Sequence, residues 1–559
     1  MRTTPPELIA KFHAAGWWGN ATLYDLFAAN TARVPERLAV IDPPNRPELV
    51  GGAPLRLSYA ALDARVRRLA ARLLREGLTR GDIVIAQLPN IAEYVILYLA
   101  AARIGLVLSP VPMQYRGHEL GHIIALTRPA AFVTVASFRG SDYAALARQA
   151  MQGHGPVLLL GGGAAPGAIT LADDDGSGAE LDAAAPPAAD DSFTICWTSG
   201  TEGVPKGVPR SHNHWVAIGW AHFDGAQLRD GDRLLNPFPL VNMGAIGGCF
   251  LSWLRAAGTL ILHHPLDLAV YLRQIANERA DYAIAPPAVL NMLLQNDALL
   301  DSADLSSLRC IGSGSAPLAA WMIEGYRARF GIDVVNIFGS NEGVSLISGP
   351  IEIPDPALRA RYFPRFGRPE VRWPARTAAM IETRLLDPDS GVEILTAGPP
   401  GELQIRGPGV FDGYFRSPEL TARAFTADHW FRTGDLFRIA GEPGDLRYYE
   451  FVGRARQQIV RGGFKISPEE LDELLAGHPD IAEAAVIGIP DRVLGERVCA
   501  MVVPRPGRNV TLDDLRHYFE ERGVAVFKWP ERVRILTQLP RNPMGKVVRE
   551  ELSRFAAAG

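Results

Sequence analysis

Along most of the chain, short apolar stretches alternate with amphipathic stretches of helical length. Residues 59–76 repeat leucine, valine and alanine at helical spacing with arginines on the other face, and Ser58 is suited to cap this helix. A buried strand is expected at 83–88, a helix at 92–103 and another strand at 106–111. Such alternation predicts βαβ units around a largely parallel sheet, so the expected fold class is α/β.

The length of the chain calls for more than one domain, because 559 residues exceed what a single hydrophobic core usually supports. A large region of parallel-sheet βαβ subdomains is expected over residues 1–455. Over residues 456–559 the pattern becomes a compact α+β series, which predicts a small C-terminal domain. Its first helix is expected to begin after Ser467, with Glu470 completing a capping box. Residues 161–190, rich in Gly, Ala, Pro and Asp, are expected to form an exposed excursion between strands.

Composition excludes several classes of partner. Hydrophobic residues make up 47% and charged residues 21% of the chain, and the formal net charge is only −4. This balance gives no reason to expect a nucleic-acid partner, which needs clustered Lys and Arg. The four cysteines lie far apart, which argues against a disulfide framework and favours a reducing, cytoplasmic compartment. No apolar run reaches the roughly 18 residues that a membrane span needs.

The sharpest local signal is the sequence TSGTEGVPKG at 198–207, which follows an apolar run typical of a strand. Its glycines allow tight turns that bring backbone N–H groups toward an anion, and its hydroxyls and Lys206 add donors for a polyphosphate. It differs from a Walker A loop, because Lys206 is followed by Gly207 and neighbouring prolines oppose a helix. A hairpin loop with an incidental lysine is the alternative. The density of donors favours a phosphate-binding loop.

This loop resembles the signature of the adenylate-forming superfamily, which comprises acyl- and aryl-CoA synthetases, peptide-synthetase adenylation domains and luciferases. Four further segments resemble motifs of that family and occur in the same order as in the family. They are FGSNE at 338–342, FRTGD at 431–435, GRARQQI at 453–459 with RGG at 461–463, and PRNPMGK at 540–546. The likeness extends from about residue 20 to residue 552. The resemblance implies that a carboxylate attacks the α-phosphate of ATP, that pyrophosphate leaves, and that catalysis consists mostly of positioning and electrostatic stabilisation.

The resemblance also implies a set of nucleotide contacts. The implied ATP and AMP contacts are Thr198, Ser199, Gly200, Thr201, Gly203, Lys206, Gly314, Ser315, Ala316, Phe338, Gly339, Ser340, Asn341, Asp435 and Arg454. Among them Asp435 would accept the ribose hydroxyls, and Phe338 would stack on adenine, although it could equally belong to the core. Glu342 resembles the Mg²⁺-binding glutamate of the family, a hard oxygen ligand that suits a phosphate-bridging metal.

The C-terminal motifs imply the rest of the machinery. Lys546 resembles the lysine that bridges the attacking carboxylate and the α-phosphate, and with Lys206 and Glu342 it forms the implied catalytic set. The small domain is expected to be mobile, to rotate about a hinge at Arg456, and to present a glycine-lined tunnel for coenzyme A at Gly462 and Gly463. A glycine there would allow close backbone approach to the pantetheine chain. A plain turn between strands is compatible with the same residues.

Several positions depart from the family pattern. Asn341 replaces the usual threonine beside the metal glutamate, and its amide could still donate a hydrogen bond to phosphate. Arg456 replaces the common Asp or Lys at the hinge. The residues expected to border the acid are Trp220, Asn242, Met243, Ile246, Gly312 and Gly314. His212 and His214 lack a matched third ligand, so we expect solvated or capping histidines rather than a metal site.

Three functional hypotheses follow from the resemblance. The first is an acid–CoA ligase that uses Mg²⁺ and ATP to join a small carboxylic acid, expected to be apolar, to coenzyme A. The second is a stand-alone aryl acid–AMP ligase that loads a phosphopantetheinyl carrier protein. The third, a nucleotide-binding protein that has lost catalysis, has Asn341 as its only support.

Overall fold

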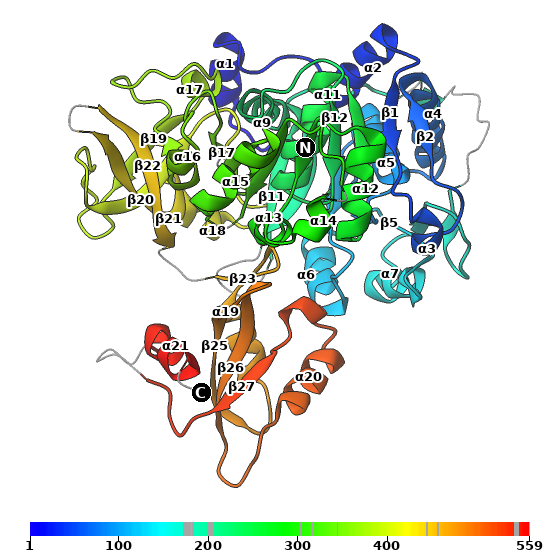
Figure 1. Cartoon of the computed structure of the whole chain (residues 1–559). Helices are drawn as coiled ribbons and strands as arrows, with labels where there is room; N and C mark the ends of the chain where they lie inside the picture. The colour runs from blue at the N-terminus through cyan, green and yellow to red at the C-terminus, as the bar shows by residue number, and fades with distance from the viewer. Residues whose placement is uncertain are drawn as a thin grey trace. The chain divides into compact units, whose positions relative to one another are not determined.

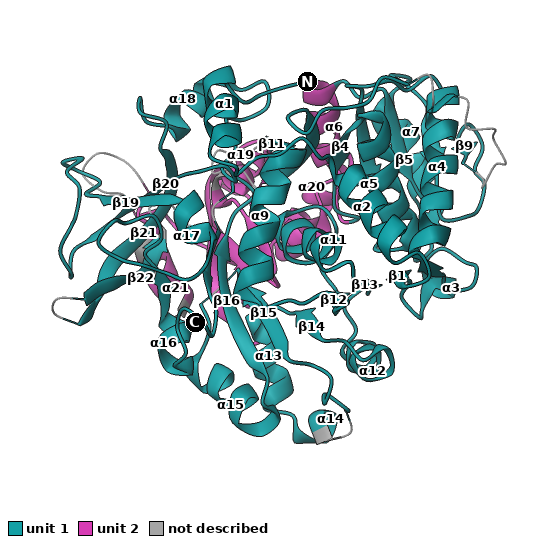
Figure 2. Cartoon of the chain, turned by 90° about the horizontal axis from the view of Figure 1, so that it is seen from above, with its two compact units in different colours: residues 1–113, 128–197, 207–453 teal, residues 114–127, 198–206, 454–559 magenta. Residues whose placement is uncertain are grey.

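A computed structural model describes residues 1–171, 180–181, 184–198, 205–301, 303–315, 317–343, 345–442, 445–454, 458–540 and 547–557. The chain forms two compact units, coloured teal and magenta in Figure 2. Unit 1 consists of residues 1–113, 128–197 and 207–453. Unit 2 consists of residues 114–127, 198–206 and 454–559. The C-terminal unit therefore also contains two short segments from the first half of the sequence, and the domain boundary after residue 455 remains a prediction.

A seven-stranded sheet is built from the first βαβ repeats, and the six strands from β10 to β9 pair in parallel. Its strands, in spatial order, are β11 (Lys206–Ser211), β10 (Ser192–Thr198), β4 (Val107–Pro110), β3 (Ile83–Gln87), β5 (Ala131–Thr134), β8 (Val157–Leu159) and β9 (Ile169–Thr170). The expected excursion at 161–190 is partly wrong, because β9 lies within it and pairs with β8.

Unit 1 also contains an eight-stranded sheet, which is parallel except at its two ends. Its strands, in spatial order, are β17 (Ser345–Ser348), β16 (Asp333–Gly339), β15 (Cys310–Gly314), β14 (Tyr282–Ile284), β12 (Arg233–Asn236), β13 (Thr259–Leu262), β1 (Leu38–Ile41) and β2 (Arg56–Ser58). Figure 1 labels several of these strands among the helices that cover them. The predicted α/β fold class, with largely parallel sheets, is confirmed.

The predicted helices begin and end where their signals lie. Helix α4 (Tyr59–Arg75) starts after Ser58, whose side chain accepts the N–H of Ala61. Helix α5 (Ala92–Ile104) ends at Gly105, which has the left-handed φ of 75° that favours glycine. The other helices of unit 1 are α1 (Pro6–Ala14), α2 (Leu23–Arg33), α3 (Arg46–Leu49), α7 (Tyr143–Met151), α9 (His212–Gly225), α10 (Met243–Ala245), the π-helix η1 (Ile246–Leu251), α11 (Ser252–Ala256), α12 (Leu268–Glu278), α13 (Pro287–Leu294), α14 (Asp297–Asp301), α15 (Ala320–Phe330), α16 (Pro356–Arg361), α17 (Thr377–Met380) and α18 (Pro418–Ala424).

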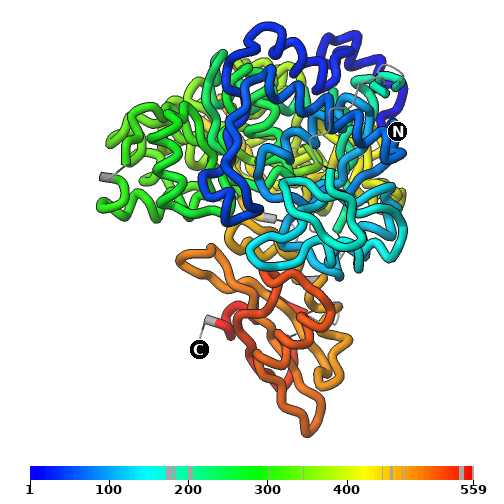
Figure 3. Tube along the Cα trace, turned by 90° about the vertical axis from the view of Figure 1, so that its right-hand side faces the viewer, coloured from blue at the N-terminus to red at the C-terminus, as the bar shows by residue number. Residues whose placement is uncertain are grey.

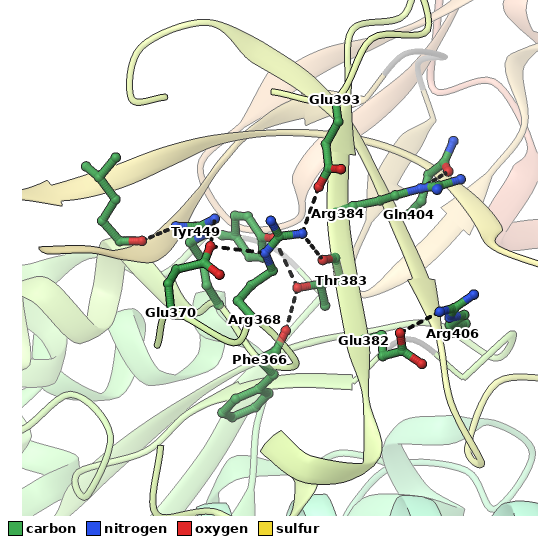
Figure 4. A network of polar contacts seen from close by, with 12 residues as sticks. Phe366, Arg368, Glu370, Glu382, Thr383, Arg384, Glu393, Gln404, Arg406 and Tyr449 are labelled. Carbon is green, nitrogen blue, oxygen red and sulfur yellow. Dashed lines mark hydrogen bonds and ion pairs between the residues drawn. The ribbon is translucent and has the colours of Figure 1, made fainter. Parts of the chain in front are cut away.

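A third sheet of unit 1 carries the Thr-Gly-Asp motif. Its strands, in spatial order, are β18 (Tyr362–Pro364), β22 (Asp445–Arg454), β21 (Phe431–Glu442), β20 (Pro400–Arg406) and β19 (Glu382–Leu386). Directly opposed residues of β19 and β20 form polar pairs: Arg406 contacts Glu382 at 2.6 Å, and Arg384 contacts Gln404 at 3.0 Å (Figure 4). Such cross-strand pairs fix the register of the sheet that holds β21.

Unit 2 is an α+β unit. Its sheet runs in the order β24 (Phe464–Ile466), β23 (Ile459–Arg461), β26 (Gly495–Pro504) and β25 (Ile481–Asp491), and β27 (Arg532–Ile535) pairs with β26. Its helices are α6 (Gly117–Thr127), α19 (Pro468–Ala476), α20 (Leu512–Glu521), the 3₁₀ turn η2 (Val526–Lys528) and α21 (Arg549–Ala557). The orange and red trace of its C-terminal segment stays compact in two perpendicular views (Figures 1 and 3). In the part of the chain that the structure describes, no helix is long and apolar enough to cross a bilayer.

Candidate active site

The two ends of the predicted phosphate loop are fixed by sheet strands. Thr198 is the last residue of β10, and Lys206 is the first residue of β11. Gly207 permits a close approach, because a Cβ there would lie 2.9 Å from the Ile195 side chain. Its carbonyl accepts the N–H of Phe415 at 2.8 Å. The predicted residues Ser199, Gly200, Thr201, Gly203, Ala316, Arg456 and Lys546 lie outside the described residues.

Asn341 joins two segments that lie far apart in the sequence. Its amide nitrogen donates to the carbonyl of Trp197 at 3.1 Å, one residue before Thr198. Its amide oxygen accepts the N–H of Met243 at 2.8 Å, at the start of α10. The end of β10, the turn after β16 and the predicted acid-binding segment are therefore adjacent. The amide nitrogen carries two N–H donors, so the bond to Trp197 does not exclude the expected hydrogen bond to phosphate.

The backbone of Asn341 is held by a buried arginine that the sequence did not single out. Arg210 donates through Nε to the carbonyl of Asn341 at 2.9 Å, and through Nη1 to the carbonyl of Gly409 at 2.8 Å. Its side chain is fully buried, and burial lowers its pKa to about 10. The guanidinium also lies over the ring of Trp215. The carbonyls that accept its hydrogen bonds are neutral, so their dipoles stabilise this cation together with the charges of Glu342 and Asp412.

Glu342, the predicted metal ligand, is nearly buried and oriented by a tyrosine. Its side chain is 9% exposed, and the hydroxyl of Tyr414 donates to one carboxylate oxygen at 3.0 Å. Burial and the neighbouring Glu342 raise the pKa of Tyr414, so the hydroxyl stays protonated and remains a donor. Carboxylate lone pairs are left for a hard cation, so this residue fits Mg²⁺, which keeps most of its ligands as water and phosphate oxygen. No motif of the sequence points to Tyr414.

Hydrogen bonds hold the Thr-Gly-Asp motif in place within β21. Gly434 has a φ of 70°, which explains the glycine, and its N–H donates to Glu402 at 3.2 Å. The hydroxyl of Thr433 accepts the N–H of Asp435 at 3.1 Å and donates to the carbonyl of Leu403 at 2.8 Å. Asp435 is buried at 4% exposure. This arrangement holds a carboxylate in a defined position, as ribose binding would require.

The predicted adenine segment lies at the ends of β15 and β16. A Cβ at Gly314 would lie 2.1 Å from the carbonyl of Ile337, so this glycine is required by close backbone packing. Ser315 has a left-handed φ of 72°, a strained conformation of the kind that concentrates at functional sites. Phe338 packs edge-on against Phe437 with ring centroids 4.9 Å apart, so its ring contributes to an aromatic cluster. Adenine stacking by this half-buried ring remains a prediction.

The predicted acid-binding residues have unequal surroundings. Asn242 caps α10 by accepting the N–H of Ala245 at 3.3 Å, and Ile246 is fully buried in η1. Gly312 has no open space beside it, because a Cβ there would lie 2.2 Å from the hydroxyl of Tyr282. Met243, whose N–H bonds to Asn341, is thus the residue of this set most directly linked to the rest of the site.

Trp220, one of the residues expected to border the acid, has two arginines over its ring. The guanidinium of Arg255 lies 3.3 Å from the ring centroid of Trp220, and that of Arg376 lies 3.5 Å from it. Two cations so close to the ring leave little of its surface for an acid.

The two histidines at the start of α9 are buried, so the expectation of solvated histidines is wrong. His214 completes a capping box with Ser211, as the capping alternative predicted. His212 accepts the N–H of Leu23 at 3.3 Å and stacks on Phe193 with ring centroids 4.7 Å apart. In the described part of the chain, no cluster of three or more His, Cys, Asp or Glu side chains could hold a metal ion.

A small cavity lies beside α9 and the residue that follows Glu342. Its volume is about 10 Å³, room for one water molecule. Its lining includes Gly343, Ser345 and Thr377, and both hydroxyls are buried without a hydrogen-bond partner among the described residues.

The predicted tunnel glycines form a turn in unit 2. Gly462 and Gly463, with φ of 55° and 86°, connect β23 to β24. Two successive left-handed residues are typical of a tight hairpin, which is the plain-turn alternative. Nothing lies within 4 Å of a Cβ built at Gly463, so its backbone conformation already accounts for the glycine. A tunnel for coenzyme A remains a prediction, and so does the contact of Arg454 with the nucleotide.

Two family models match this chain. Residues 27–415 match the family model described as AMP-binding enzyme, and residues 470–546 match that of the AMP-binding enzyme C-terminal domain. The 2-hydroxy-7-methoxy-5-methyl-1-naphthoate–CoA ligase of Streptomyces carzinostaticus is 31% identical, over 99% of this chain and 96% of that protein. The salicyl-AMP ligase / salicyl-S-ArCP synthetase of Mycobacterium tuberculosis is also 31% identical, over 98% of this chain and 93% of that protein.

Among solved structures, the amide bond synthetase McbA from Marinactinospora thermotolerans superposes with a TM-score of 0.80 at 25% identity. The alignment covers 96% of this chain and 99% of that chain. These similarities extend over both parts of the sequence, and the motif at 338–342 lies within the stretch that matches the AMP-binding enzyme model. The chain belongs to the family of AMP-binding enzymes, the ATP-dependent adenylate-forming ligases.

Proposed function

We propose that the protein is an ATP-dependent carboxylic acid–CoA ligase that forms an acyl-adenylate and pyrophosphate, and then transfers the acyl group to the thiol of coenzyme A with release of AMP. The observation that carries the adenylation step is the hydrogen bond from Asn341 to the carbonyl of Trp197. Through it, the strand that enters the phosphate loop lies beside Glu342, the carboxylate suited to a phosphate-bridging metal.

Each predicted residue has a defined task in this proposal. Lys206 and the loop hydroxyls offset the charge of the β- and γ-phosphates, and Asp435 accepts the ribose hydroxyls. Glu342 would hold Mg²⁺, which supplies charge neutralisation between phosphate oxygens. Lys546 draws the carboxylate of the acid and the α-phosphate together, which lowers the cost of bringing two anions into contact.

Transfer to coenzyme A, rather than to a carrier protein, is the finer part of the proposal. Its support is the naphthoate–CoA ligase relative and the absence, in the sequence, of a pocket that resembles those specific for dihydroxybenzoate. The salicyl-AMP ligase relative, whose name includes a carrier-bound product, supports the alternative equally by identity. Coenzyme A and a carrier protein present the same phosphopantetheine thiol. The two functions are therefore distinguished by the molecule that carries this thiol.

Pyrophosphate release over a panel of aliphatic, alicyclic and aromatic acids tests the first step and identifies the acid. We expect release with at least one acid and its loss in Lys546→Ala. Thioester formation with free coenzyme A, compared with a phosphopantetheinylated aryl carrier protein, then separates the two acceptors. If none of the acids in the panel leads to release of pyrophosphate, the result favours a nucleotide-binding protein without ligase activity.

A further inference from the structure

Asn341 stands at the junction of three segments, and each of its contacts is to backbone or to a backbone-holding arginine. The side chain bonds to the carbonyl of Trp197 and to the N–H of Met243, whereas its own carbonyl accepts from Arg210. A side chain that donates to one main chain and accepts from another fixes the separation of the two. The two segments are the strand that leads into the phosphate loop and the first turn of the acid-binding region.

We infer that Asn341 is a positioning residue for the acid: it sets the position of Met243 relative to the strand that enters the phosphate loop. This inference rests on the proposed function and names the part of the site on which Asn341 acts. The Met243 N–H is the first donor of α10, which has no partner within its own helix. The amide oxygen of Asn341 supplies that partner, and Asn242 supplies one for the N–H of Ala245.

The buried guanidinium makes the arrangement rigid. Because Arg210 holds the carbonyl of Asn341 and that of Gly409, replacing the side chain at 341 leaves the backbone anchor in place. Loss of the amide therefore frees the start of α10 without releasing residue 341. The effect is expected to fall on the acid, since ATP contacts the loop, the metal ligand and Asp435 in the proposed mechanism.

The chain provides a matched control on the strand that precedes Asn341. Asn336 lies in β16, is buried at 3% exposure, and donates through its amide to the carbonyls of Arg359 and Ala360, both at 3.1 Å. It resembles Asn341 in residue type and in bonding to backbone, but its partners belong to α16. Asn336→Ala reports the cost of losing such an amide away from the acid-binding segment.

We expect Asn341→Ala to raise the KM for an accepted acid about tenfold, the size expected when a buried N–H loses its acceptor. The KM for ATP should stay within about twofold of wild type, because the phosphate loop, Glu342 and Asp435 remain in place. Asn341→Asp keeps an acceptor for the Met243 N–H, so its KM for the acid should lie between that of the wild type and that of Asn341→Ala. A rise in the KM for ATP, or a fall in kcat with the acid KM unchanged, would overturn the inference in favour of a direct phosphate contact.

Hydrogen–deuterium exchange gives a readout that does not require activity. In Asn341→Ala, amides of the peptide 240–247 should exchange at least about tenfold faster, whereas Asn336→Ala should leave this peptide unchanged. An unchanged peptide in Asn341→Ala contradicts the inference, whether or not the enzyme turns over. If the wild type releases no pyrophosphate with any acid but the peptide responds as expected, the proposed function fails and the positioning of this segment stands.

Discussion

Two buried cations, one in each unit, are stabilised in opposite ways. In unit 1 the guanidinium of Arg210 faces carbonyl oxygens of Asn341 and Gly409, and burial lowers its pKa. In unit 2 the amine of Lys528 lies 2.5 Å from Glu470 and 3.1 Å from Glu119, and these carboxylates outweigh burial and raise its pKa. The carbonyl dipoles around Arg210 stabilise its charge and connect two segments of the chain. The two carboxylates around Lys528 need its positive charge, because without it they would be buried and unpaired.

The centre around Lys528 is also the more extensive of the two. Glu119 on α6 is fully buried and accepts the N–H of Ala525 at 3.1 Å. His118 of the same helix lies 3.7 Å from Glu470, the residue expected to complete a capping box. Ser467 does cap α19 by accepting the N–H of Glu470 at 3.4 Å, while the carboxylate of Glu470 pairs with Lys528. One lysine thus connects α6 to α19 and η2 within unit 2.

The largest effect is expected for Lys528→Met. It leaves two carboxylates buried side by side without a cation, so unit 2 should lose about 3–5 kcal/mol of stability. Hydrogen exchange of peptides from residues 458–540 measures this loss separately from unit 1. Adding Glu119→Gln and Glu470→Gln should restore most of it, because neutral amides keep the acceptors. Full stability of the single variant would show that the carboxylates are already protonated.

Arg210→Met should cost less, about 2 kcal/mol, because it leaves two carbonyls without donors but breaks no direct ion pair. Urea unfolding of the purified protein measures the change. Arg210→Lys is the control. It keeps a cation at this position, but its ammonium cannot reach both carbonyls as the guanidinium fork does. If Arg210→Met lowers the free energy of unfolding as much as Lys528→Met does, removing a cation costs the same whether its partners are carbonyls or carboxylates.

Acid should weaken unit 1 through a third buried group, His222. Burial lowers its pKa to about 4 from the ordinary 6.5, and both ring nitrogens are without partners among the described residues. The unfolded chain takes up the proton first, so the stability due to neutral His222 is present above pH 6.5 and is lost as the pH falls toward 4. At pH 5.5 the loss should be about 1 kcal/mol.

The control for this titration is His222→Phe, which should abolish that part of the difference in unfolding free energy between about pH 7.5 and about pH 5.5. Glu470 behaves differently, because its lowered pKa delays any loss until the pH falls below its ordinary value of 4.5. A wild type and a His222→Phe variant with the same pH dependence above about 5 would show that His222 is not the group that titrates.

The smallest effect is expected for Arg376→Ala, where the cation is about half exposed and stacks on Trp220. Its ion pair with Asp224 is solvated, so stability should fall by only about 0.5 kcal/mol. The KM for an accepted acid should not change, since the ring of Trp220 is covered by two guanidinium groups in this structure. A severalfold change in that KM, measured in the pyrophosphate assay, would restore Trp220 to the acid pocket.

Local features of the sequence predicted the fold well. The helix at 59–76 has a periodic apolar face and a serine cap, both of which operate within a few residues. The helix expected after Ser467 followed for the same reason, because its serine cap is also a local signal. Pairing between distant segments was less accessible: residues 161–190 gave no periodic signal, yet β9 extends the first sheet.

The site divides in the same way. The motif residues Glu342 and Asp435 could be named from the sequence, because each motif is contiguous. Arg210 and Tyr414 could not, since their importance comes from partners at 341, 409 and 342 that only the fold brings near. The surroundings of Gly312 and Trp220 could not be predicted either, because neither the Tyr282 hydroxyl nor the two guanidinium groups has any signature at the neighbouring positions.

The membership of α6 in unit 2 has a consequence for protein engineering. A chimaera that exchanges the C-terminal part of this enzyme for that of a relative at residue 454 would leave Glu119 facing whatever side chain the donor carries in place of Lys528. Functional exchange of this part therefore requires residues 114–127 to travel with it, as a discontinuous cassette.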